Sequence, residues 1–317
     1  MITLYLKSLN KVITDPDHSI FEELKFEDLL WIDLLDPTPR ERIIVENYLD
    51  FTIQTREQAE EIETSSRYSE HEGYIQCNSN FSILKEEGFI IEPVSFTIIH
   101  DILISMRTCY LRTFAEASRK LQISYKSHTT GYHILVSLLE ARIDLDADMV
   151  EVISKQIAAI SNSTSMEDKG VDKEVLLKIN RLQESTMLLR ETIFDRQRLL
   201  SGAQRSDMFP DEIYTRITIM LKDIGSLLNH ADFNFERLEF LQDMYMGLIN
   251  IEQNKIIKMF TVLSVIFMPP TLIASMYGMN FEFMPELDWD YGYLFAIGMM
   301  LASMGATLLF FKRKNWL

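Results

Sequence analysis

The sequence has few of the residues on which metal and redox centres depend. Its 317 residues include two isolated cysteines, Cys77 and Cys109, and six histidines with no pair at the spacing of a helical metal site. Isolated cysteines in a cytoplasmic domain are expected to stay reduced, and a zinc site of His and Cys is not supported. Basic residues are also scarce, since 31 Lys and Arg against 47 Asp and Glu leave a net charge of -16. This balance suits cations and argues against nucleic acid as a partner.

The sequence also lacks the short motifs of common enzymes and nucleotide-binding proteins. It contains no Gly-x-x-x-x-Gly-Lys loop, so pumping driven by ATP is not supported. It contains no nucleophile elbow, catalytic triad or His-Glu-x-x-His pattern, and we predict neither an enzyme nor an organic cofactor. The first ten residues hold no long apolar run after a basic start, so no cleaved signal is expected.

Two long apolar runs, residues 259–278 and 291–311, stand near the end of the sequence, and neither contains a charge. Each is close to the ~20 residues that a helix needs to cross a bilayer. The linker between them, residues 279–290, is too short to hold a domain, so we predict a hairpin of two spanning helices. The alternative is a helical hairpin buried in a soluble core, where two such runs are hard to accommodate.

The charges around the hairpin predict its orientation. The basic residues lie before the first run and in the tail 312–317: Lys255, Lys258, Lys312, Arg313 and Lys314. The linker has only acidic charges: Glu282, Glu286, Asp288 and Asp290. Positive charge near spans stays in the cytoplasm. We therefore predict a multi-pass protein of the inner membrane with both termini in the cytoplasm and the linker outside.

The region before the hairpin is long enough for a soluble domain. Residues 1–130 alternate like an α+β domain, and the predicted strands are 2–6, 30–34, 74–77, 94–99 and 102–106, with a helix at 40–49. Residues 131–210 have helical periodicity at 133–162 and 171–200, with a turn at Ser201, Gly202 and Pro210. Residues 211–258 predict the cytoplasmic part of a stalk helix that continues into the first span. A helix of about 60 residues would be about 90 Å long, and it would pack against copies of itself or companion helices.

The stalk helix and the first span share one stripe of small, polar and aliphatic residues. Successive members are alternately four and three residues apart: Asp243, Gly247, Asn250, Asn254, Ile257, Thr261, Ser264, Met268, Thr271, Ser275 and Gly278. A mean step of 3.5 keeps one face toward the axis of a left-handed bundle. Polar groups in hydrocarbon usually face protein or water. We predict that several copies line a water-filled pore, and the alternative is contact between helices through small residues.

Several motifs resemble the CorA family of magnesium transporters. The family signature stands here as Gly278-Met279-Asn280 after Tyr277, and its loop as Met284-Pro285-Glu286-Leu287. Residues 247–254, both spans and the end 311–317 match as well, and residues 31–37 resemble the early strand and turn of the family. The extended tip and tail look most like the proteobacterial branch of magnesium, nickel and cobalt transporters.

The resemblance implies an α+β cytoplasmic domain, a long stalk helix and two C-terminal spans, assembled as a homopentamer in membrane lipid. It implies a passive channel for hydrated divalent cations that takes up Mg²⁺, and also Co²⁺ and Ni²⁺. The membrane potential would drive the flow, worth about 2.3 kcal/mol per charge per 100 mV. Cytoplasmic Mg²⁺ would also regulate the gate, through carboxylates between subunits. Asp223, Glu86 and Glu87 are candidates among many acidic residues, and the alternative for each is a solvated surface charge.

The resemblance also implies roles for single residues. Gly278, Met279 and Asn280 would form the selective mouth, with Asn280 in a ring. Positions that the family uses to line its pore fall on the stripe: Asn254, Ile257, Ser264, Met268 and Thr271. Phe260 stands where the family has an aliphatic gate residue, which leaves the narrowest point open. Asp243 matches an aspartate ring, so Asn280 and Asp243 are the expected metal contacts.

Outside the mouth, Glu286, Asp288 and Asp290 would concentrate cations, or would serve only as solvated loop residues. Two other functions stay open from the sequence. One is zinc transport by the related zinc-transporting branch, and the other is a membrane-tethered divalent sensor that does not conduct.

Overall fold

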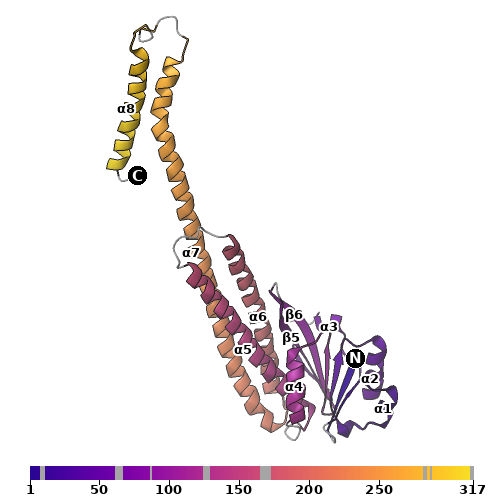
Figure 1. Cartoon of the computed structure of the whole chain (residues 1–317). Helices are drawn as coiled ribbons and strands as arrows, with labels where there is room; N and C mark the ends of the chain where they lie inside the picture. Colours follow the sequence, from indigo (N-terminus) through magenta and orange to yellow (C-terminus); the bar gives the residue numbers. More distant parts are fainter. Residues whose placement is uncertain are drawn as a thin grey trace. The chain divides into compact units, whose positions relative to one another are not determined.

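The computed structural model describes residues 1–7, 11–60, 67–85, 88–123, 129–164, 173–280, 284–285 and 288–314. The chain divides into two compact units, Met1–Gln242 and Asp243–Leu317 (Figure 1). The first is an α/β unit, and the second holds the end of a long helix and one more apolar helix. The fold class expected from the sequence is therefore confirmed.

A seven-stranded sheet forms the centre of the first unit, in the order β2-β1-β3-β7-β6-β5-β4. Its strands are β1 Ile2–Leu6, β2 Val12–Thr14, β3 Leu29–Leu35, β4 Tyr68–His71, β5 Tyr74–Lys85, β6 Gly88–Ile99 and β7 Ile102–Arg107. Only β3 and β7 pair in parallel, and the other neighbours are antiparallel. The turn between β6 and β7 has positive φ at His100 and Asp101, as a two-residue hairpin of the primed type requires.

Helices cover both faces of this sheet (Figure 1). Helices α1 His18–Glu23 and α2 Pro39–Leu49 pack on one face, where Phe21, Val45 and Leu49 join the inward side chains of β1, β3 and β7 in one core. Helices α4 Arg112–Ile123, α5 Gly131–Thr164 and α6 Lys173–Arg205 cover the other face. Two short elements complete the unit, η1 Phe26–Asp28 and α3 Arg56–Glu60. Strand β3 is thus buried on both sides, which explains why its sequence is apolar except for Asp33.

Residues 31–37 resemble the early strand and turn of the CorA family. Two of their side chains, Trp31 and Asp33, form hydrogen bonds that join β3 to β7. Trp31 Nε1 donates to Ser105 Oγ at 2.8 Å, and Ser105 Oγ donates to Asp33 Oδ1 at 2.8 Å. Arg107 Nη2 pairs with Asp33 Oδ2 at 2.7 Å, and the guanidinium lies over the Phe114 ring of α4. A buried carboxylate needs such partners, because leaving it unpaired in an apolar layer would cost several kcal/mol.

A second buried ionic cluster fastens α5 and α6 to β5. Both oxygens of Asp146 are bonded, one to Arg142 and the other to Arg196. Arg142 Nη1 also donates to the Ser82 carbonyl at 2.9 Å, and Arg196 Nη1 to the Asn80 carbonyl at 3.2 Å. All three charged side chains are at most 3% exposed.

Two glycines permit close approaches that no other residue allows. A Cβ at Gly131, where α5 begins, would lie 2.4 Å from the Leu103 nitrogen of β7. A Cβ at Gly202 would lie 2.7 Å from the Tyr68 ring of β4. The predicted turn at Ser201 and Gly202 is therefore wrong: α6 continues to Arg205, and Gly202 serves packing against the sheet.

The predicted strands 74–77 and 94–99 are correct in place but too short. Strands β5 and β6 pair over their whole length, from Tyr74 opposite Ile99 to Lys85 opposite Gly88. The sequence did not predict the longer strands, because the polar run 78–80 and Pro93 are untypical of a buried strand. Asn80 lies opposite Pro93, which has no N–H to offer, and the carbonyl of Asn80 accepts from Arg196 instead.

Helix α7 Asp211–Tyr277 runs without a break for 67 residues, as the sequence predicted. In the first unit it packs beside α5 and α6. Arg216 binds Glu140 of α5, with Nη2 2.6 Å from Oε2, and Gln183 of α6 donates to Gln242 at 3.0 Å. Pro269 and Pro270 lie inside the helix and do not end it.

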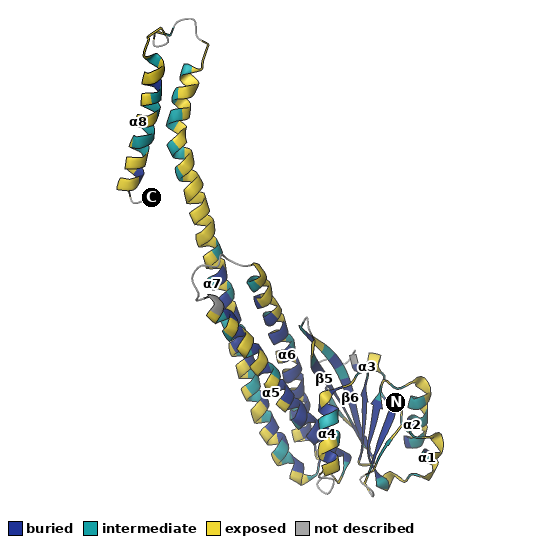
Figure 2. Cartoon of the chain, viewed as in Figure 1, coloured by how far each residue is buried: buried dark blue, intermediate teal, exposed yellow. Residues whose placement is uncertain are grey.

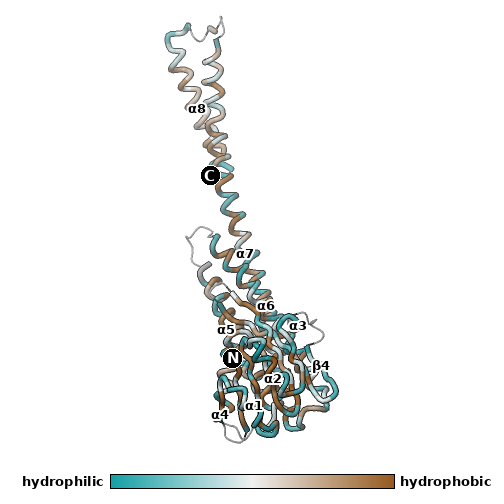
Figure 3. The backbone as a smooth tube through the Cα atoms, turned by 90° about the vertical axis from the view of Figure 1, so that its right-hand side faces the viewer, coloured by the Kyte–Doolittle hydropathy of each residue, from teal (hydrophilic) through white to brown (hydrophobic). Residues whose placement is uncertain are grey.

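The second unit contains the rest of α7, from Asp243, and α8 Gly292–Arg313 beside it (Figures 1 and 3). Both helices are long and apolar enough to cross a membrane, and only 6% and 11% of their most apolar windows are buried (Figure 2). A core helix of a soluble protein would be mostly buried, and a signal sequence would lie near the N-terminus. Their exposure and their place at the end of the chain fit neither, and favour a pair of membrane spans.

Candidate ion-conducting face and outer mouth

The striped face of α7 is uncovered in the single chain. Every position of the stripe from Asp243 to Gly278 is exposed. Another side of the helix is only half-exposed: Val262, Val265, Ile266, Pro269, Pro270, Ile273 and Tyr277. Because α8 is the other helix of this unit, we assign that half-exposed side to contact with α8. The stripe is then the side of α7 left for further copies or for water.

Within the first span the stripe forms a shallow groove on the helix surface. The groove is lined by Ser264, Phe267, Met268, Thr271, Leu272 and Ser275. Thr271 Oγ1 donates to the Phe267 carbonyl at 2.8 Å, and Thr261 Oγ1 donates to the Ile257 carbonyl at 2.8 Å. The hydroxyl protons of these threonines are thus used within the helix, and the oxygens present their remaining lone pairs outward as acceptors. Such a surface suits a cation that keeps its water shell, because the outer hydrogens of the shell are donors.

Three large apolar side chains border or interrupt this polar surface. Ile257 is 61% exposed, Phe260 59% and Met268 66%. Phe260 lies three residues after Ile257 and four before Ser264, so it adjoins the stripe next to Thr261. In a closed bundle, rings of these side chains would be the dry constrictions between polar layers.

The signature tripeptide lies where α7 ends. The Gly278 nitrogen donates to the Ala274 carbonyl at 3.0 Å, and the Met279 nitrogen to the Met276 carbonyl at 3.4 Å. A Cβ at Gly278 would lie 3.2 Å from the Ala274 oxygen, so a side chain there would press on the last helical turn. Asn280 follows outside the helix, and all three residues are exposed. The glycine thus closes the helix tightly and leaves the carboxamide of Asn280 at its end.

The predicted acidic residues of the outer linker are only partly described. Asp288 and Asp290 are exposed and flank Trp289, whereas Glu282 and Glu286 lie outside the described residues. The rings of Trp289 and Phe295 lie 5.6 Å apart, and those of Trp289 and Tyr291 6.3 Å apart. Our sequence analysis missed this aromatic group at the start of α8. Trp and Tyr beside an apolar run are the usual signal for residues at a membrane surface.

The lower stripe positions lie on the exposed surface of α7. Asp243, Asn250 and Asn254 are exposed, as are Lys255 and Lys258. No group of three or more His, Cys, Asp or Glu that could hold a metal is found among the described residues. Asp223 is exposed on α7, and Glu86 and Glu87 lie outside the described residues.

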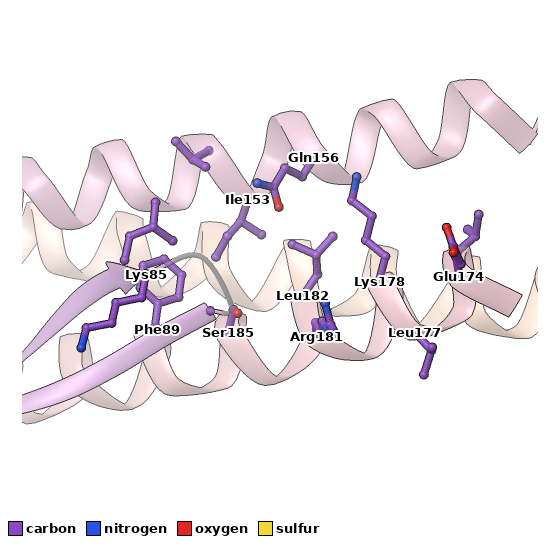
Figure 4. Close-up of a pocket in the computed structure, with 14 residues that line it drawn as sticks. Lys85, Phe89, Ile153, Gln156, Glu174, Leu177, Lys178, Arg181, Leu182 and Ser185 are labelled. Atoms are coloured by element: carbon purple, nitrogen blue, oxygen red, sulfur yellow. The ribbon is translucent and has the colours of Figure 1, made fainter.

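A cavity in the first unit does not suit a divalent cation. It has a volume of about 730 Å³ and lies between α5, α6 and the end of the β5–β6 hairpin (Figure 4). Phe89, Ile153 and Leu182 line it, together with the basic side chains Lys85, Lys178 and Arg181 and one acidic residue, Glu174. The excess positive charge would repel Mg²⁺.

An α/β unit and a long helix with an exposed polar stripe, followed by a short linker and a second apolar helix, together define a class of membrane proteins with two C-terminal spans. The family model of the CorA-like Mg²⁺ transporter protein matches residues 26–313. The chain belongs to the CorA family.

The sequences of named relatives match this sequence over nearly the whole chain or all of it. The chain is 38% identical to the magnesium transport protein CorA of Wolinella succinogenes, over 100% of both chains. It is 37% identical to the magnesium transport protein CorA of Salmonella typhimurium, over 92% of each chain. The complete structure of the CorA magnesium transporter from Methanocaldococcus jannaschii shares the fold, with a TM-score of 0.82 at 18% identity, over 100% of this chain and 98% of that one.

Proposed function

We propose that this protein is a channel that takes up Mg²⁺ across the inner membrane, with a homopentamer as its working form. Membership of the CorA family carries the proposal. The exposed stripe of α7 supports it independently, because one helix cannot enclose water and several copies around an axis can. Co²⁺ and Ni²⁺ would use the same path.

Selection would occur at the ring of Asn280. Mg²⁺ loses its inner water shell reluctantly. Carboxamide oxygens can accept hydrogen bonds from those waters, and they have no fixed charge that would trap the ion. Gly278 would let the backbone approach the axis, Met279 would pack beside it, and Asp288 and Asp290 would raise the local cation concentration outside.

The stripe below the mouth would conduct the hydrated ion. Ser264, Thr271 and Ser275 would offer acceptor oxygens in the membrane, and Asn250 and Asn254 would do so below it. Asp243 would be the first full negative charge of the stripe on the cytoplasmic side. The membrane potential, negative inside, drives a divalent cation inward at about 4.6 kcal/mol per 100 mV, twice the value for one charge.

Gating would move rings of apolar side chains into and out of the path of the ion. We expect Phe260→Ala to raise leak through the closed channel, because a ring of large apolar side chains excludes water and a ring of methyl groups does not. The measurement is Mg²⁺ leak into proteoliposomes at the high internal Mg²⁺ that favours closure. Phe310→Ala, the same change at an exposed position of α8, is the matched control. An unchanged leak for Phe260→Ala would place the gate elsewhere, with Ile257 and Met268 as the next candidates.

Regulation by cytoplasmic Mg²⁺ would work by favouring one state of the bundle over another. Carboxylates from neighbouring chains would bind the ion and hold the bundle closed. The -16 charge of the chain supplies many candidates, Asp223 among them.

The proposed orientation has both termini in the cytoplasm. A reporter that is active only in the cytoplasm should therefore work when it is fused after Leu317, because the basic residues near both spans resist translocation. Fusion of the same reporter into the linker at Asp288 is the opposite control and should be inactive. Activity of the linker fusion alone would reverse the topology.

The decisive experiment for the function is Mg²⁺ flux into proteoliposomes with an imposed potential. Potential-driven uptake, with Zn²⁺ a weak competitor, is the expected result. Faster uptake of Zn²⁺ than of Mg²⁺ would favour the zinc-transporting branch. No uptake by folded, oligomeric protein would favour a sensor that does not conduct.

A further inference from the structure

The cavity between α5, α6 and the end of the β5–β6 hairpin has the size and the walls of a ligand pocket. Its volume of about 730 Å³ lies within the roughly 300–1,000 Å³ of pockets that hold small organic molecules. Its walls include buried side chains from each of these elements: Phe89 of β6, Ile153 of α5 and Leu182 of α6 (Figure 4). The pocket can therefore cover the apolar part of a ligand.

The rim of this pocket has an excess of positive charge. Lys85 at the end of β5 and Lys178 and Arg181 of α6 are exposed and line the pocket. The acidic residue among the described lining residues is Glu174, so three positive charges less one negative charge leave +2. The chain as a whole has a net charge of -16, so this rim is opposite in sign to the rest of the molecule. The pocket therefore attracts anions.

The positive charges lie beside the apolar walls. Lys178 and Arg181 are three residues apart on α6, so they share one face of that helix. The side chain of Lys178 extends from α6 toward α5, and Lys85 lies next to Phe89 at the other end of the pocket (Figure 4). A ligand can thus place its charged groups at Lys178 and Arg181 while its apolar or aromatic part lies against the buried walls.

The walls and the charges together favour one kind of small anion. Inorganic phosphate would use the cations and leave the apolar walls in contact with water. A fatty acid would cover the walls but would bring one negative charge to three cations. A nucleoside triphosphate has a base that stacks on aromatic side chains and several negative charges that bind Lys and Arg. Its Mg²⁺ complex has less negative charge, so the positive rim favours the metal-free form.

We propose that this pocket binds a nucleoside triphosphate in its metal-free form, with the phosphates at Lys178 and Arg181 and the base beside Phe89. Side chains hold the phosphates at this site, so it needs no Gly-x-x-x-x-Gly-Lys loop. Because Mg²⁺ binds the same phosphates, occupancy of the pocket rises as the Mg²⁺ concentration of the cytoplasm falls. None of the described lining residues belongs to the stripe of α7, so the site does not rest on the proposed channel.

Equilibrium dialysis of the full-length protein in detergent, with radiolabelled ATP in metal-free buffer, tests the site without any measurement of flux. We expect one ATP bound per chain, with adenosine and tripolyphosphate each at least about tenfold weaker, because each lacks one of the two recognised parts. Absence of ATP binding to the folded protein would overturn the proposal. Tripolyphosphate bound as tightly as ATP would overturn it too, since the apolar walls would then play no part. Palmitate bound more tightly than ATP would overturn it in favour of an acyl chain.

Two pocket variants locate the bound ATP. Lys178→Gln with Arg181→Gln should weaken binding on the order of a hundredfold, because two contacts to charged phosphates are lost. Lys155→Gln is the matched control and should bind normally, since Lys155 pairs with Glu151 on α5 and is not among the described lining residues. Val152→Trp leaves the charges in place and fills the pocket from an exposed lining position, so it should also abolish binding. Undiminished binding by either pocket variant, in protein that circular dichroism shows to be folded, would overturn the proposal.

Discussion

Replacing Asn280 by alanine is expected to abolish Mg²⁺ uptake while leaving the protein folded and assembled. The carboxamide is exposed beyond the last turn of α7, so its removal leaves no cavity and breaks no described packing. What is lost is a ring of acceptors for the water shell of the ion. One hydrogen bond is worth about 1 kcal/mol net, and a ring of several would lower flux on the order of a hundredfold or more.

The measurement is potential-driven Mg²⁺ uptake into proteoliposomes, with the two proteins reconstituted side by side at equal density. Asn180→Ala is the matched control, because it makes the same chemical change at an exposed position of α6 in the first unit. That control should keep its flux. Full uptake by Asn280→Ala would move selection away from the mouth, toward the hydroxyl and amide layers of the stripe. No uptake by the unchanged protein would instead contradict conduction itself.

The stripe was predictable because its signal is periodic. From Asp243 to Gly278 the sequence alternates steps of four and three, and a continuous helix turns that period into one face. The structure leaves that whole face exposed. What the face meets depends on other copies of the chain, which a period in one sequence does not specify.

Contacts between residues far apart in the sequence were much harder to predict. Gly202 resembles a turn residue in the sequence, and only the ring of Tyr68 explains why a glycine stands inside α6. Asp146, Arg142 and Arg196 look like ordinary surface charges of two helices. Fifty residues separate Asp146 from Arg196, and only the fold brings them together. The polar run 78–80 likewise concealed the middle of β5 in the sequence, since its partners come from distant residues: Ser95 of β6 donates to Asn78, and Arg196 of α6 donates to Ser79 and Asn80.

The buried ionic cluster carries the largest stability effect that we expect. Asp146→Asn should lower the stability of the first unit by about 3–5 kcal/mol, because it leaves two buried guanidinium groups without a counter-charge. An asparagine could accept from one arginine, but its NH₂ group would face the other as a second donor. Burial already lowers the pKa of Arg142, and the charge of Asp146 opposes that shift. Removing the carboxylate therefore makes the charged form of Arg142 still less favourable.

Thermal unfolding of the full-length protein in detergent measures this effect. A loss of 3–5 kcal/mol would lower Tm on the order of 10 °C for a unit of this size. Asp144→Asn is the matched control, since Asp144 is exposed on the same helix two residues earlier. It should change stability by no more than about 0.5 kcal/mol. Equal Tm values for the two variants would mean that the buried cluster contributes little.

A triple replacement, Arg142→Met with Asp146→Leu and Arg196→Met, separates two effects on stability. One is the cost of leaving a buried charge unpaired, and the other is the loss of the hydrogen bonds from the arginines to β5. Buried ion pairs can often be exchanged for apolar residues without loss, because the desolvation of the charges disappears together with their attraction. Here the exchange also removes the donors to the carbonyls of Ser82 and Asn80. We therefore expect the Tm of the triple variant to lie between those of Asp146→Asn and the unchanged protein. A Tm at or below that of Asp146→Asn would show that the arginines matter chiefly as donors to β5, because then removing the unpaired charges would recover nothing.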